Sequence, residues 1–130
     1  MTWTRPSGQV AADEQIAEAM AAGHEPLSLE RRADAAWLER LPAPGFHEFG
    51  TSAGEIGYEG TAERVAAATD PHGEPISVEN MRGWLLAEGL VMVRYTSENH
   101  GRRSNRTSLW RCIAPGQWQV LHHQGTITTR

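Results

Sequence analysis

The chain has 130 residues, of which 39% are hydrophobic and 22% are charged. This balance is typical of one globular domain with its own core, and it excludes two independent domains, a collagen-like repeat and a disordered chain. The formal net charge of −4 argues against a general nucleic-acid binder. No stretch approaches the roughly 18 apolar residues of a membrane span, so no membrane partner is expected.

Every basic residue is an arginine, and Cys112 is the only cysteine. The lack of lysine excludes Schiff-base and P-loop chemistry, because both need an ammonium group. A single cysteine excludes an intrachain disulfide and a multi-cysteine zinc site. Residues 1–10 show no export signal, so we expect a cytoplasmic protein. Five arginines and no acid follow Glu98, which indicates either an anion-attracting patch or solvated strand surfaces.

The first part of the chain predicts helices. We expect residues 1–10 to form a loose arm and residues 11–130 to form the single domain. A helix is predicted over 13–22, where alanine and glutamate are frequent and acids occupy the first turn. Ser28 is a candidate N-cap for a second helix over 29–41, whose apolar side chains recur every four residues. This apolar stripe consists of Leu29, Ala33, Trp37 and Leu41.

The pattern then changes to that of a sheet. Residues 46–51 and 55–58 predict a short hairpin, and Thr61 is a candidate cap for a third helix over 62–69. Four longer strands are predicted at 76–87, 90–97, 105–113 and 117–124. Helices followed by strands indicate an α+β fold, a curved antiparallel sheet with the helices on its concave face. A cone-shaped space between sheet and helices is the natural place for a pocket.

Two sequence segments carry a resemblance to a known family. Residues 46–54 read FHEFGTSAG, and residues 106–126 contain RTSLWR and GQWQVLHHQGT. With the element order, they resemble the nuclear-transport-factor-2-like (NTF2-like) superfamily, most closely its small bacterial proteins with F-x-E-F-G-x-S-G and H-Q-G-T elements. Ala53 interrupts the first element as an insertion. The resemblance implies a cone-shaped barrel, often dimeric through its sheet. It implies no single function, because the superfamily contains ketosteroid isomerases, dehydratases, SnoaL-type cyclases and non-catalytic domains.

Strand alternation places Arg106, Ser108 and Trp110 on one face of the segment 105–113. The resemblance puts Ser108 roughly where the isomerases keep a protonated acid that donates to an oxyanion, and a hydroxyl can also donate. Alternatively, Ser108 is a strand serine hydrogen-bonded inside the pocket. Arg106 is a candidate ligand-binding residue. Trp110 is expected to pack in the core or to form the wall of an apolar ligand pocket.

The adjacent His122 and His123 must point to opposite faces of the last strand. Alternation groups His122 with Gln124, which makes His122 a candidate proton-transfer residue and Gln124 a candidate ligand-binding residue. The sequence does not fix the register well enough to decide whether His122 or His123 faces the pocket. The two histidines cannot bind one metal ion together, and no H-x-H spacing is present, so we expect no metal site. The run from His123 to Thr126 has an alternative interpretation as a simple strand end, where Gly125 permits an unusual turn.

His47 and Glu48 lie where the isomerases carry a carboxylate base. The resemblance places that base on Phe49, so alternation turns His47 and Phe49 toward the pocket and Glu48 away from it. His47 could replace the base, because imidazole titrates near neutral pH; otherwise it is satisfied by a backbone carbonyl. Glu48 would need a partner if buried, and we expect a structural ion pair with Arg106 or, preferentially, Arg111.

These observations predict a dimeric protein that binds a small, partly apolar organic molecule between sheet and helices. As an enzyme it would use acid–base chemistry without a cofactor, such as isomerisation, cyclisation or dehydration. The apolar ligand-binding candidates are Trp37, Phe49 and Trp110. The alternative is a non-catalytic protein-interaction or ligand-sensing domain that works through the sheet face, with aromatic side chains filling the interior.

Overall fold

Helices precede a six-stranded sheet in the computed structural model, which describes residues 8–49, 55–57, 76–99 and 101–128. The helices are α1 (Gly8–His24), the 3₁₀ helix η1 (Glu25–Leu27), α2 (Leu29–Arg32) and α3 (Ala35–Arg40). The strands are β1 (Pro42–Phe49), β2 (Glu55–Gly57), β3 (Ser77–Ala87), β4 (Leu90–Asn99), β5 (Arg102–Ala114) and β6 (Gln117–Ile127). The predicted α+β class is confirmed. The third helix expected over 62–69 lies outside the described residues.

The strands of the sheet are ordered β2-β1-β6-β5-β4-β3. Neighbouring strands are antiparallel except for β1 and β6, which pair in parallel. The sheet is therefore mixed, whereas the sequence predicted a wholly antiparallel one. This one parallel pair brings the first strand of the chain beside the last.

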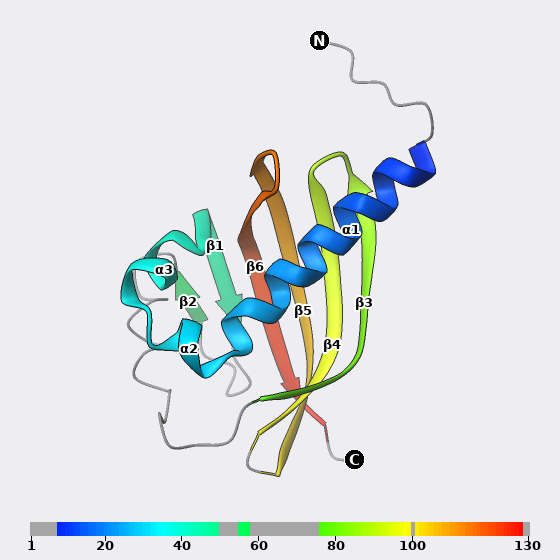
Figure 1. Ribbon diagram of the computed structural model, residues 1–130. Coiled ribbons are helices and arrows are strands. Elements are labelled where there is room, and N and C mark those ends of the chain that lie inside the picture. The colour runs from blue at the N-terminus through cyan, green and yellow to red at the C-terminus, as the bar shows by residue number, and fades with distance from the viewer. Residues whose placement is uncertain (1–7, 50–54, 58–75, 100, 129–130) are drawn as a thin grey trace.

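Helix α1 lies across one face of the sheet and contacts β3, β4 and β6 (Figure 1). We call this face the interior face and the opposite one the outer face. Gly83 of β3 allows the helix to approach closely. A Cβ atom there would lie 2.8 Å from Cγ2 of Ile16 and 3.3 Å from Cγ of Met20, both on α1. The glycine is thus needed for helix packing, because a real Cβ atom does not tolerate the shorter contact.

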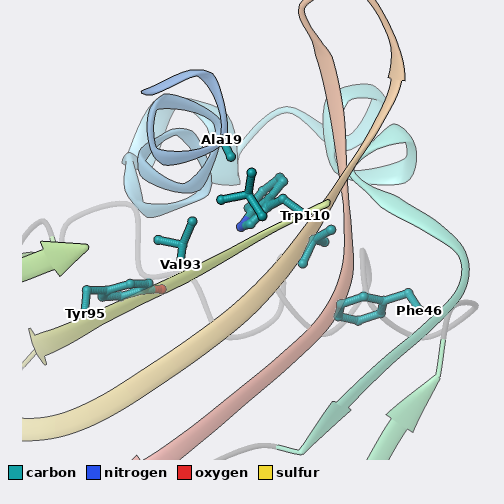
Figure 2. Close-up of a cluster of buried hydrophobic side chains, with 7 residues drawn as sticks. Ala19, Phe46, Val93, Tyr95 and Trp110 are labelled. Carbon is teal, nitrogen blue, oxygen red and sulfur yellow. The ribbon is translucent and has the colours of Figure 1, made fainter. Parts of the chain in front are cut away.

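The hydrophobic core forms between α1 and the interior face. In β4 every second residue from Val91 to Ser97 is buried, as expected for a strand with one covered face. Figure 2 shows Ala19 of α1 above the side chains that rise from the sheet. The buried cluster consists of Ala19, Phe46, Val91, Val93, Tyr95, Trp110 and Val120.

Helix α1 begins earlier than the sequence indicated. It starts at Gly8, so residues 8–10 are helical and do not belong to a loose arm. Asp13 and Glu14 consequently lie beyond the first turn, which contains no acid. The expected cap at Ser28 is confirmed, because the Arg31 amide donates to Ser28 Oγ at 3.2 Å.

The predicted second helix is split in two. Asp34 has an extended backbone, and its side chain accepts from the Trp37 amide at 3.0 Å, so it caps a new helix, α3. The new helix α3 therefore buries different positions from those that one continuous helix would bury. Leu38 becomes the buried residue of α3, Ala33 is exposed, and the expected four-residue stripe is not continuous.

Gly83→Ala should destabilise the fold by about 1–3 kcal/mol, because the new methyl group overpacks the contact with Ile16. Urea denaturation measures this loss. The matched control is Ile16→Leu, which removes the obstructing Cγ2 atom. The double variant should recover most of the lost stability, and additive losses in the double variant would contradict the proposed contact.

Candidate functional site

The buried polar side chains in the described part of the chain all lie on the interior face. They are Glu48, Ser97, Ser104 and Ser108. The strand registers bring them together: Ser97 is opposite Ser104, and Ser108 is opposite His123, which is itself opposite Glu48. Buried polar groups are stable only when they are hydrogen-bonded, so this group of residues is the first candidate for a site.

Ser108 and His123 form the closest polar contact of this group. Ser108 Oγ lies 2.7 Å from His123 Nδ1, and the serine is only 4% exposed. Which atom donates depends on the tautomer of the imidazole. If Nδ1 carries the proton and donates to the serine, Nε2 is the unprotonated and basic nitrogen of the ring. If the hydroxyl donates, Nε2 carries the proton and is an acid.

Glu48 lies on β1 at the position opposite His123 and is 5% exposed. Ser108, His123 and Glu48 therefore form one row across β5, β6 and β1. Neighbouring strands are about 4.8 Å apart, so the register places Glu48 and His123 side by side on the interior face.

Tyr95 and Arg106 occupy the next row of the interior face. They are opposite each other on β4 and β5, and Gly125 of β6 completes the row. Arg106 is half-buried, and its Nε donates to Ser97 Oγ at 3.2 Å. Burial raises the pKa of the Tyr95 phenol above its ordinary value, against the opposing effect of the Arg106 and Arg32 guanidinium groups. Tyr95 is thus a neutral hydrogen-bond donor at physiological pH.

Trp110 forms the apolar end of the same face, beneath α1 (Figure 2). The side chain is 2% exposed, and it is packed close to Gly23 of α1. Its Nε1–H is the one buried side-chain donor without a hydrogen-bond partner in the described part of the chain. An unpaired buried donor costs free energy, so this indole favours a ligand or water oxygen beside it.

Comparisons with known proteins identify the fold. No protein-family model matches the chain, and no curated protein matches it. Solved structures do match. An NTF2-like protein from Cytophaga hutchinsonii has a TM-score of 0.70 at 12% identity, over 85% of this chain and 95% of that one. The chain has the NTF2-like fold.

Two further structures with this fold carry functional names. A protein provisionally assigned as a ketosteroid isomerase, from Parabacteroides distasonis, has a TM-score of 0.66 at 14% identity, over 85% of this chain and 86% of that one. A protein provisionally assigned as a Ca/calmodulin-dependent kinase II association domain, from Exiguobacterium sibiricum, has a TM-score of 0.68 at 16% identity, over 98% and 99%. The structural matches establish the NTF2-like fold, whereas sequence identities this low leave the function open.

The two histidines expected to face the pocket lie on the outer face instead. His47 and His122 are opposite each other on β1 and β6, and their rings stack at 6.0 Å between centroids. In β6 the cause is a bulge: Trp110 pairs with Val120 and Leu109 with His122, so Leu121 is an extra residue that reverses the alternation. The assumption that Val120 and His122 share a face was wrong, and His123 lies inside.

In β1 the alternation is also opposite to the expected one. Phe46 belongs to the core, so Glu48 has the same interior orientation and His47 points outward. The register between β1 and β6 shifts between Pro42 and His47, beside Gly45 with its positive φ of 84°. The resemblance had predicted that His47 and Phe49 point inward, which is one residue away from the observed alternation.

The remaining predicted site residues divide between the two faces. Arg111 is exposed on the outer face, so the expected ion pair with Glu48 does not form. Gln124 is exposed on the outer face. Trp37 of α3 is half-buried beneath the Arg31 guanidinium, 5.2 Å from the ring centroid. Ser108, Arg106 and Trp110 share the interior face as expected, and the side chain of Phe49 lies outside the described part.

Sequence reasoning missed His123 and Tyr95 as site residues. No signal in the sequence marks Leu121 as a bulge, so His123 could not have been preferred. Tyr95 could have been found, because it alternates with Val91 and Val93 along a clearly patterned strand. The arginine-rich end does not form a single patch, since Arg103 is paired with Glu79 and Glu98 at 3.0 and 3.1 Å.

The described part of the chain contains no group of three or more His, Cys, Asp or Glu side chains placed to hold a metal ion. Its helices are also too short or too polar to cross a bilayer.

The raised pKa of Tyr95 predicts an alkaline loss of stability. The folded state holds the phenolic proton to a higher pH than the unfolded chain, so the stabilisation is complete below the unfolded pKa of about 10 and is lost as the pH rises through the folded pKa. We expect Tyr95→Phe to flatten the fall in unfolding free energy between about pH 9 and 11. Urea denaturation across that range tests this, and equal slopes in both proteins would refute it.

Proposed function

We propose that the protein binds a small, partly apolar organic molecule against the interior face and moves a proton on it without a cofactor. The observation that carries this proposal is the 2.7 Å contact between Ser108 Oγ and His123 Nδ1 on a buried face, with Glu48 opposite the histidine. A hydrogen-bonded imidazole beside a carboxylate is an arrangement that suits general acid–base catalysis.

His123 is the proposed proton-transfer group. With Nδ1–H donating to Ser108, Nε2 accepts a proton from the bound molecule, and the imidazole becomes positively charged. The Glu48 carboxylate on the neighbouring strand stabilises that charge, so the proton transfer becomes less uphill. The imidazolium can then return the proton to another atom of the same molecule. Such a cycle performs an isomerisation, and it performs a dehydration if the proton leaves with a hydroxyl group.

The neighbouring residues supply the other requirements of this chemistry. The neutral Tyr95 phenol and the Arg106 guanidinium can donate to an oxygen on which negative charge develops. The provisional isomerase assignment of the Parabacteroides distasonis structure supports acid–base chemistry as a use of this fold, though only by analogy.

A thermal-shift screen of a metabolite library identifies compounds that bind, and these are then tested for conversion to a product. For a compound that is converted, His123→Asn should lower the turnover by about 10²–10⁴-fold. Ser108→Ala should weaken binding or turnover in the same assay. The matched control is His122→Asn, the same change one residue earlier on the outer face. Equal losses in His122→Asn and His123→Asn, or no loss in the latter, would refute the proposed site.

A second candidate function concerns the outer face. Trp84, Leu86 and Ile113 are large apolar side chains that are 39%, 52% and 51% exposed. We propose that a second copy of the chain covers this face in a homodimer. The provisional association-domain assignment of the Exiguobacterium sibiricum structure supports assembly as a use of the fold, again by analogy.

Leu86→Glu together with Ile113→Glu should convert the dimer to a monomer, because a buried unpaired carboxylate is strongly unfavourable. Sedimentation equilibrium of both proteins measures the mass directly. The exposed-surface variant Glu88→Gln serves as the control and should remain dimeric. A wild-type protein that sediments as a monomer at high micromolar concentration would exclude the homodimer.

A further inference from the structure

Arg106 is a half-buried cation on the interior face. Its one hydrogen bond in the described structure is from Nε to Ser97 Oγ at 3.2 Å, and no carboxylate in the described ranges forms an ion pair with it. The guanidinium is always charged at physiological pH, and its two terminal nitrogens carry four further N–H donors besides the one on Nε. A half-buried cation of this kind favours an anionic partner.

Charged groups of both signs act on Tyr95. The charged groups that act on its phenol are Arg106, Arg32 and Glu48, two cations and one anion. Arg32 has partners of its own, among them the Pro26 carbonyl at 2.7 Å from Nε. Among the described charged groups that act on Tyr95, cations therefore outnumber anions, and Arg106 is the cation directly opposite Tyr95 on β5.

The other groups on this face are also donors. The Tyr95 phenol, the Ser108 hydroxyl and the unpaired Trp110 indole N–H follow one another toward α1. Residues two apart on a strand are about 6.7 Å apart, so Arg106 and Trp110 are separated by roughly 13 Å. A molecule lying along this face would have an anionic group at Arg106 and its reacting carbon near His123, with its apolar end directed toward the core at Trp110.

From this arrangement we infer that the substrate is a small organic acid whose carboxylate is bound by the Arg106 guanidinium. The inference rests on the proposed function and adds the chemical class of the ligand. The planar fork of a guanidinium matches a carboxylate with two parallel hydrogen bonds. With the acid group bound there, His123 in the adjacent row lies beside a carbon a few bonds away from the carboxylate.

The test compares acids with neutral molecules of the same shape. The probes are phenylacetate and 3-phenylpropionate with their amides, titrated into the wild-type protein while the tryptophan indole N–H signals are followed by ¹⁵N NMR. Each acid should shift the signal of Trp110 and bind at least tenfold more tightly than its amide. If acid and amide bind equally, or if neither acid shifts the signal at 50 mM, the inference is overturned.

Two arginine variants on the same strand locate the charge. Arg106→Gln should remove the preference for acid over amide, whereas the matched control Arg111→Gln, with the same charge change on the outer face, should keep it. An equal loss in both variants would show a general charge effect and overturn the inference. Arg106→Lys, which keeps the charge and loses the fork, should retain only part of the preference and serves if the glutamine variant does not fold.

The two proposals can fail separately. Equal affinity for acid and amide at the interior face would refute carboxylate binding by Arg106 and would not affect the proposed function. The His123→Asn and His122→Asn comparison tests the proposed function itself. If those variants show that the interior face has no role, an acid bound at Arg106 would be a ligand of that face and not a substrate.

Discussion

Strand β6 is the element on which the arrangement of the interior depends. It is hydrogen-bonded on both sides, antiparallel to β5 and parallel to β1, so its register is fixed twice. The extra residue Leu121 reverses the alternation halfway along the strand, and both neighbours must accommodate it. His123 therefore turns inward between Ser108 and Glu48, and His122 turns outward against His47. The extra residue Leu121 therefore determines which of the two imidazoles lies on the interior face.

The interior face is divided in composition. Under α1 it is apolar (Figure 2). It also carries serine hydroxyl groups, the Glu48 carboxylate and the Arg106 guanidinium. Buried polar groups reduce stability unless each finds a partner, and Ser108 and Ser97 do so with His123 and Arg106. The apolar half provides most of the stabilisation, because burial of Val, Phe and Trp side chains is strongly favourable. The polar half can therefore be organised for binding.

Local pattern was enough to predict the strands and the fold class. Residues 90–97 alternate clearly, and the turns at Gly89 and Gly116 have the positive φ that glycine favours. The parallel pairing of β1 with β6 was not predictable, since it depends on contacts between distant segments. The break at Asp34 was visible as a capping residue, yet the apolar spacing around it favoured one continuous helix. The predicted orientation of the site residues was wrong for a different reason, because the register shifts in β1 and β6 leave no trace in the local sequence pattern.

The parallel pair also bears on how the chain folds. Hairpins β3–β4, β4–β5 and β5–β6 join segments that are close in sequence, and each closes only a short loop. Strand β1 pairs on one side with β2, which follows it closely, but on its other side it pairs with β6, the last strand of the sheet in chain order. Synthesis on the ribosome therefore leaves that side of β1 unpaired until β6 has emerged. The row of Ser108, His123 and Glu48 is completed by this late, long-range step, so the candidate site and the closure of the fold form together.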